Sequence, residues 1–240
     1  MTPFPIYKIE NVASPSSIKR ASHVHEIVGM FQSLHLLKQY CGLVKEKQGN
    51  GERILLLPGW LSHEKVMFPV KKYLTKLGYA PEYWGLGMNI GDVKAARDKI
   101  VKRLKKENST EKITLIGWSL GGLIAREIAR ELPDRIASVL TYGTPVIGGP
   151  KYTIGAKYYG ETESERIATL FEELDEYHPI TVPMTIIFTK KDSFVAWKAC
   201  LDYKSEHVKH FEVNSTHLSL GLDPDVWKIM AWHLQNVGRK

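Results

Sequence analysis

The sequence predicts an α/β fold with a mainly parallel sheet and helices on both faces. From residue 53 onward, short apolar runs alternate with amphipathic helical runs, and this alternation is typical of parallel strands joined by helices. A Gly-Trp-Ser-Leu-Gly-Gly turn at residues 117–122 separates one such run from the next helix. The chain has 240 residues, of which 43% are hydrophobic, which is enough for one domain of this kind but not for two.

The predicted strands are short apolar runs, many of whose residues are β-branched or aromatic. They span residues 53–57, 80–84, 113–116, 138–142, 184–188 and 209–213. The predicted helices show apolar residues at helical spacing, and they span residues 68–77, 92–106, 123–131, 167–177, 196–201 and 224–236. In such a sheet the carboxyl ends of the strands meet at one edge, so we expect functional groups on the loops that follow the strands.

Residues 1–50 are predicted to form an N-terminal unit that precedes the domain of residues 51–240. Residues 1–21 contain Pro and Ser and indicate an extended arm. Residues 24–41 carry apolar side chains at helical spacing, which predicts an amphipathic helix. We expect this helix to pack on the domain, and the alternatives are a flap over the site or contact with a membrane surface.

Ser119 is the candidate nucleophile. It lies in a G-x-S-x-G turn between the strand run at residues 113–116 and a helical run. A nucleophilic serine needs a sharp turn that exposes its Oγ, and neighbouring glycines let the helix and the strand approach closely. The alternative is a glycine-rich helix cap without chemistry.

A nucleophilic serine needs a base and an acid that orients the base. Asp192 follows the strand at residues 184–188, and His217 follows the last predicted strand. Asp175 and Asp202 are rival acids, but the first lies on a predicted helix and the second directly after one. Six other histidines lie before the first strand or within predicted strands and helices: His23, His25, His35, His207, His210 and His233.

An oxyanion intermediate needs two backbone N–H donors, one from the residue after the nucleophile and one from the turn after an early strand. Leu120 supplies the first. The second is expected from the turn that begins at Pro58-Gly59, where Trp60 is the better candidate and Leu61 the second choice. The alternative is that Pro58-Gly59 is only a tight turn.

These motifs resemble the α/β-hydrolase superfamily, in particular small bacterial esterases and lipase-like hydrolases. The resemblance covers residues 53–233 and includes the Pro-Gly turn, the serine turn, and the segments at residues 85–87, 143–145, 192–197 and 215–221. It implies hydrolysis of carboxylic esters by Ser119, Asp192 and His217 through an acyl-enzyme, with no metal and no organic cofactor. Two departures are Pro58, where many lipases have histidine, and Ser193-Phe194, where the family often has glycine.

The segment at residues 145–166 is rich in Gly and Tyr and lacks a sustained amphipathic period, so it predicts a small cap or none. We therefore expect a small-molecule ester substrate with a short to medium acyl chain. The alternatives are a thioesterase or acyltransferase with the same triad, and a non-catalytic binding protein of this fold.

The net charge of +7 comes largely from residues 93–106, whose pattern predicts a helix with a solvated basic face. A basic surface attracts anionic lipid weakly, so we expect weak contact with a membrane surface at most, and the lack of a nucleic-acid motif predicts no nucleic-acid partner. Cys41 and Cys200, the two cysteines, do not indicate a disulfide framework. The lack of a leader and of a long apolar run predicts a soluble, cytoplasmic protein.

Overall fold

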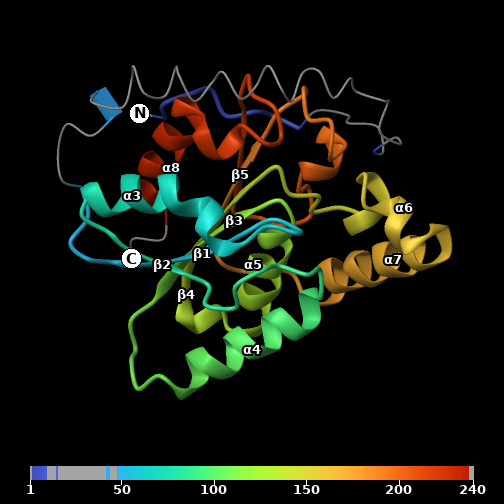
Figure 1. Ribbon diagram of the computed structural model, residues 1–240, viewed down its shortest axis with the longest axis horizontal. Coiled ribbons are helices and arrows are strands. Elements are labelled where there is room, and N and C mark those ends of the chain that lie inside the picture. The colour runs from blue at the N-terminus through green and yellow to red at the C-terminus, as the bar shows by residue number, and fades with distance from the viewer. Residues whose placement is uncertain (1, 10–14, 16–41, 44–47, 238–240) are drawn as a thin grey trace.

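The computed structural model describes residues 2–9, 15, 42–43 and 48–237. Within them, six parallel strands form one sheet in the order β2-β1-β3-β4-β5-β6 (Figure 1). The strands are β1 Arg53–Leu57, β2 Ala80–Tyr83, β3 Ile113–Trp118, β4 Ile136–Tyr142, β5 Met184–Phe188 and β6 Val208–Glu212. The expected fold class is confirmed. The helix expected at residues 24–41 lies outside the described residues.

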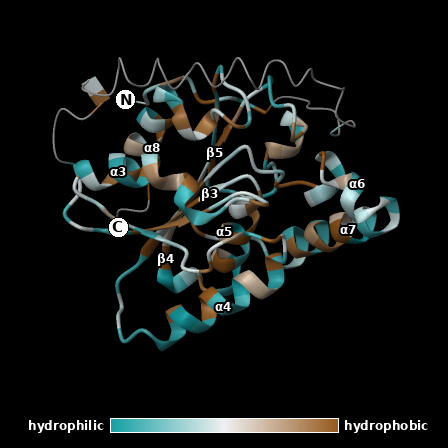
Figure 2. Ribbon diagram, viewed as in Figure 1, coloured by the Kyte–Doolittle hydropathy of each residue, from teal (hydrophilic) through white to brown (hydrophobic). Residues whose placement is uncertain are grey.

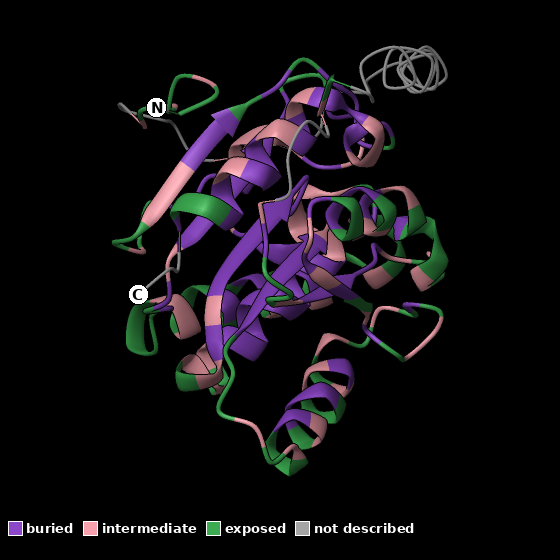
Figure 3. Ribbon diagram, turned by 90° about the vertical axis from the view of Figure 1, so that its left-hand side faces the viewer, coloured by how far each residue is buried: buried purple, intermediate pink, exposed green. Residues whose placement is uncertain are grey.

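Helices cover both faces of the sheet. Ile54 and Leu56 face a core shared with α3 (Phe68–Lys76) and α8 (Pro224–Asn236). Leu55 and Leu57 face the opposite core, shared with α4 (Val93–Lys106) and α5 (Leu120–Glu131). This alternation follows from the period of two in a strand. In Figure 2 the strand beside the label β5 is brown, and in Figure 3 most of the sheet is purple, because buried apolar residues dominate the central strands.

The strand order creates a crevice at the carboxyl edge of the sheet. From β1 the chain moves outward to β2, then returns to form β3 on the other side of β1. The connections after β1 and β3 therefore leave in opposite directions, and such a switch point is where α/β sheets place ligands. The loop after β1 carries Trp60, and the turn after β3 carries Ser119.

A small cap lies between β4 and β5, and it begins within the segment at residues 145–166 for which the sequence predicts a small cap or none. It consists of the 3-10 helix η3 (Gly149–Tyr152), the short helix α6 (Ala156–Tyr159) and α7 (Glu161–Tyr177) (Figure 1). Helix α7 begins six residues before the expected start at residue 167. Its first two turns are mostly polar and exposed, so they carry no apolar period that a sequence pattern can detect.

Residues 196–201 and helix α5 also differ from expectation. Residues 196–201 do not form an α-helix, because the chain there makes only the single 3-10 turn η4 (Trp197–Cys200). Helix α5 begins at Leu120, three residues earlier than expected, because the glycines of the serine turn already belong to its first turn.

The N-terminal arm lies along the edge strand β6. The Tyr7 N–H donates a hydrogen bond of 2.8 Å to the His210 carbonyl, and the Tyr7 ring packs edge-on against Phe188 at 5.0 Å. The arm thus covers part of an otherwise unpaired strand edge. No described helix combines the length and the apolar character that crossing a bilayer requires.

Candidate active site

Ser119 occupies a strained turn between β3 and α5. Its φ of 52° and ψ of −124° are rare for a residue with a side chain, and such strain often marks functional sites. The surroundings fix this conformation: the Ser119 N–H donates to the Tyr142 carbonyl at 2.9 Å, and the Thr144 hydroxyl donates to the Ser119 carbonyl at 2.9 Å. The turn therefore holds the serine at the carboxyl edge of the sheet.

The glycines that follow Ser119 are required by close contacts. A Cβ on Gly121 would lie 2.2 Å from the Leu57 carbonyl oxygen, and a Cβ on Gly122 would lie 2.0 Å from the Thr144 hydroxyl. Neither contact is physically tolerable. Glycine here allows helix α5 to start directly against the ends of β1 and β4, which is the reason for the pattern seen in the sequence.

His217 and Asp192 form a buried hydrogen-bonded pair. The Asp192 carboxylate lies 2.8 Å from His217 Nδ1 through Oδ2, and the exposed fractions of the two residues are 8% and 3%. Oδ1 of Asp192 accepts hydrogen bonds from the Phe194 and Val195 N–H groups at 2.8 and 2.7 Å. The loop thus fixes the carboxylate, and the carboxylate fixes the imidazole so that Nε2 is the nitrogen able to act as a base.

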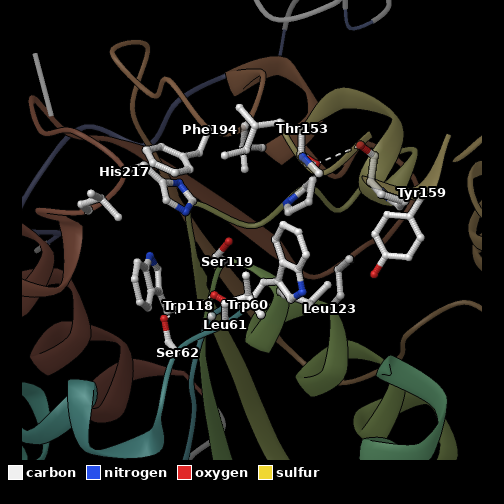
Figure 4. A pocket seen from close by; sticks show the side chains of 18 residues that line it. Trp60, Leu61, Ser62, Trp118, Ser119, Leu123, Thr153, Tyr159, Phe194 and His217 are labelled. Carbon is white, nitrogen blue, oxygen red and sulfur yellow. Dashed lines mark hydrogen bonds between the residues drawn. The ribbon is translucent and has the colours of Figure 1, made fainter. Parts of the chain in front are cut away.

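The ring of His217 lies between two aromatic side chains. It stacks on Phe194 with centroids 5.1 Å apart and lies 5.7 Å from the Trp118 ring. Figure 4 shows His217 and Ser119 directed into the same cavity, which both residues line. Phe194, at the place where related proteins were expected to have glycine, therefore packs against the histidine.

The rival acids belong to a different part of the molecule. Asp202 and Asp175 pair with the buried Arg126 of α5 at 2.6 and 3.1 Å, and Asp175 also pairs with Arg130 at 2.6 Å. Burial raises the pKa of Asp202, but the charge of Arg126 and hydrogen bonds from Ser205 outweigh it and hold this pKa at about 2. The structure does not bring either carboxylate to Ser119.

Two of the remaining histidines have structural partners. His210 accepts a hydrogen bond from the Asp202 N–H at 3.1 Å, and His233 lies 2.9 Å from the Ser138 hydroxyl and 2.8 Å from that of Thr185. Burial lowers the pKa of His210 to about 4 and that of His233 to about 3. Both imidazoles are therefore neutral near pH 7.

The choice between Trp60 and Leu61 as an oxyanion donor depends on hydrogen bonding. The Leu61 N–H already donates to the Asn89 carbonyl at 2.8 Å. The N–H groups of Trp60 and Leu120 have no acceptor among the described residues, and both residues line the cavity beside Ser119. Asn89, which no sequence pattern indicated, also donates to the Pro58 carbonyl at 2.8 Å and so holds the turn in place.

The cavity beside Ser119 has a volume of about 290 Å³, close to the lower end of the range for small-molecule sites. Its walls are mainly aromatic and aliphatic, and among the described lining residues only His217 and Tyr159 carry an ionisable side chain. Sequence reasoning did not identify Leu123, Ile154 or Tyr159, because no local pattern separates these lining residues from core or surface residues. Among the described residues, no cluster of three or more His, Cys, Asp or Glu side chains is arranged to hold a metal ion.

The comparisons with known proteins agree with this architecture. A family model described as the α/β-hydrolase fold matches residues 93–167. The mouse α/β-hydrolase domain-containing protein 10 superposes with a TM-score of 0.55, covering 76% of this chain and 88% of that protein at 16% identity. This chain has the α/β-hydrolase fold. A lipase-esterase related protein from Clostridium acetobutylicum is a second example of this α/β-hydrolase architecture, with a TM-score of 0.57 over 81% of this chain and 96% of that protein at 15% identity.

Curated relatives of this chain are named as esterases. The pimeloyl-[acyl-carrier protein] methyl ester esterase of Aliivibrio salmonicida is 27% identical over 139 residues, which is 57% of this chain and 51% of that protein. The enzyme of the same name from Vibrio vulnificus (strain YJ016) is 28% identical over 140 residues, 57% of this chain and 52% of that protein. The chain thus spans about half the length of the curated relatives that it matches.

Proposed function

We propose that this α/β-hydrolase cleaves carboxylic esters through an acyl-enzyme. Ser119 is the nucleophile, His217 the general base and Asp192 the group that orients it. The observation that carries the proposal is the meeting of a strained serine with a histidine–carboxylate pair at one apolar cavity. This combination is the arrangement that activates a weakly acidic hydroxyl.

The proposed reaction has two steps. His217 Nε2 takes the Ser119 proton as Oγ attacks the ester carbonyl, and the N–H groups of Trp60 and Leu120 stabilise the oxyanion. The tetrahedral intermediate collapses, and His217 returns the proton to the departing alkoxide, so an alcohol leaves and the acyl group stays on Ser119. Water, deprotonated by the same histidine, then attacks the acyl-enzyme and releases the acid.

The acyl portion is proposed to be short to medium in length. A cavity of about 290 Å³ with mostly apolar walls suits an uncharged acyl chain of limited size. The cap begins with two short elements, η3 and α6. Three hydrogen bonds tie this first part to the residues that follow Asp192: Ile154 N–H to the Phe194 carbonyl, Ala196 N–H to that of Tyr152, and Ile147 N–H to that of Ala199. A tethered cap of this kind favours turnover of dissolved esters. The names of the curated relatives support esters, including methyl esters, as the substrate class.

The test is a panel of p-nitrophenyl esters from acetate to palmitate, with Ser119→Ala beside the wild type. We expect kcat/KM to peak on short or medium chains and to vanish in the variant. Fluorophosphonate labelling provides a second readout: the wild type and Ser62→Ala, which changes another serine lining the cavity, should be labelled, and Ser119→Ala should not. Unlabelled, folded wild-type protein would indicate a non-catalytic role. A sharp rise in activity above the substrate's solubility limit would contradict the proposed substrate size.

A further inference from the structure

A second apolar hollow lies next to the candidate active site. It has a volume of about 150 Å³ and is formed where the 3-10 helix η1 (Glu64–Met67) and the start of α3 approach the 3-10 helix η5 (Leu220–Leu222). Its lining residues are Val66, Met67, Pro69, Val70, Trp118, Tyr142, Leu218, Gly221 and Leu222. Two of them, Trp118 and Leu218, also line the cavity beside Ser119. The two spaces are therefore adjacent, and they lie side by side next to His217.

We propose that this hollow binds the alcohol portion of the ester, an uncharged apolar group up to about the size of a benzene ring. The proposal rests on the proposed esterase function. It adds a subsite for the leaving group to the acyl cavity, and it names the class of alcohol that the subsite takes.

The positions of the proton donor and the oxyanion donors decide which portion of the ester lies where. The leaving oxygen must come within hydrogen-bond reach of His217 Nε2, which protonates it. The carbonyl oxygen must face the N–H groups of Trp60 and Leu120. Figure 4 shows His217 and Trp118 on one side of Ser119, and Trp60, Leu123 and Tyr159 on the other.

An ester bound in this orientation directs its acyl chain toward Trp60 and Leu123. Its alcohol portion leaves Ser119 on the side of His217, where Trp118 lies 5.7 Å from the imidazole centroid. Leu218, the residue after the histidine, lines both spaces. The hollow is therefore the space that receives the leaving group.

The chemistry of the hollow defines the group that fits it. None of the described residues that line it carries a charged side chain, and apolar cavities of about 150 Å³ in proteins bind benzene. Gly221 leaves space on one wall, because a Cβ built there would meet no atom closer than the Tyr142 hydroxyl at 3.9 Å. A larger residue at this position can project into the hollow without a clash at Cβ.

The experiment compares kcat/KM for benzyl butyrate, methyl butyrate and methyl hexanoate in the wild type and in Gly221→Leu. We expect the benzyl-to-methyl ratio to fall at least about 10-fold in the variant, because lost apolar space in a substrate pocket changes selectivity by this order. The hexanoate-to-butyrate ratio should stay within about twofold. Gly221→Ala should give a smaller fall in the benzyl-to-methyl ratio. If thermal melting followed by circular dichroism shows that Gly221→Leu is unfolded, the ratio in Gly221→Ala tests the proposed subsite instead.

The matched control is Ile154→Trp, on a partly exposed residue that lines the acyl cavity but not the hollow. It should change the hexanoate-to-butyrate ratio and leave the benzyl-to-methyl ratio within about twofold. The subsite assignment is overturned if the Gly221 variants alter acyl selectivity instead, or alter neither ratio. Wild-type protein that neither hydrolyses the three esters nor reacts with fluorophosphonate overturns the proposed function itself.

Discussion

Two buried carboxylates in the connection between β5 and β6 pair with different kinds of basic side chain, one with a histidine and the other with an arginine. Asp192 is 8% exposed and pairs with His217 at the cavity. Asp202 is 4% exposed and pairs with Arg126 beneath α7. We call the first place the proposed catalytic edge, defined by Ser119, Asp192 and His217. We call the second the Arg126 cluster, defined by Arg126, Arg130, Glu127, Asp175 and Asp202.

The difference shows that burial alone does not distinguish the proposed catalytic carboxylate, Asp192, from the structural carboxylate, Asp202. An arginine stays charged at every accessible pH, so the Arg126–Asp202 pair can hold α5 against the chain after η4 but cannot pass a proton. An imidazole can accept a proton and return it within one reaction, so the pairing of His217 with Asp192 can support catalysis. Asp192 and Asp202 therefore differ in two ways: Asp192 pairs with a histidine at the carboxyl edge of the sheet, whereas Asp202 pairs with an arginine away from Ser119.

The largest effect is expected at the nucleophile. Ser119→Ala should lower kcat for ester hydrolysis by a factor on the order of 10⁶, because the attacking oxygen is lost. Chemical denaturation should give the same free energy of unfolding as the wild type within about 0.5 kcal/mol. If a tenth of the activity remained, another residue would have to be the nucleophile.

Asp192→Asn should lower kcat by roughly 10⁴, because an amide at this position favours the wrong tautomer of His217. Asp175→Asn is the matched change in the Arg126 cluster, and it should leave kcat nearly unchanged. Steady-state kinetics on one p-nitrophenyl ester measure both variants. If Asp175→Asn lowered kcat and Asp192→Asn did not, the residue that orients His217 would be Asp175 on helix α7.

Asp202→Asn tests the Arg126 cluster by stability instead of activity. It leaves the guanidinium of Arg126, whose side chain is 2% exposed, without its closest counter-charge, and breaking a buried ion pair costs about 3–5 kcal/mol. Urea unfolding should show this loss, while kcat of the folded fraction stays near the wild-type value. A stable variant with impaired turnover would show that the cluster acts on catalysis.

The smallest effect concerns acid stability. Burial lowers the pKa of His210 to about 4 and that of His233 to about 3, whereas both titrate near 6.5 in an unfolded chain. As the pH falls below about 6.5, the unfolded chain binds protons that the folded chain does not, so the free energy of unfolding decreases toward pH 4. His210→Gln should make this decrease shallower in urea titrations at several pH values. Stability that rises on acidification would contradict the argument.

Local sequence patterns predicted the elements whose signals are strong. The bounds of β1, β5 and α8 agree with the expected ones because apolar runs and the Asp223-Pro224 start of α8 mark them clearly. The serine turn could be found because its glycines are required by contacts between consecutive elements. The first turns of α7 could not be predicted, since polar exposed turns carry no apolar period. The 3-10 form of η4 could not be predicted for a different reason: Ala199 and Cys200 are buried in a core cluster, and an apolar run this short does not show which kind of turn its packing will select.

The sequence by itself determined the fold class and proposed Ser119, Asp192 and His217, because chain order and loop position are local properties. Only the tertiary structure favours Trp60 over Leu61 as the proposed oxyanion donor, because the Leu61 N–H donates to the carbonyl of Asn89, which lies 28 residues further along the chain. It also decided the partners of Asp175 and Asp202, the walls of the cavity and the hollow beside Trp118. These features arise where segments that are distant in the chain pack together. The periodicity of one segment predicts which of its residues are buried, but it does not predict which residues of a distant segment will contact them.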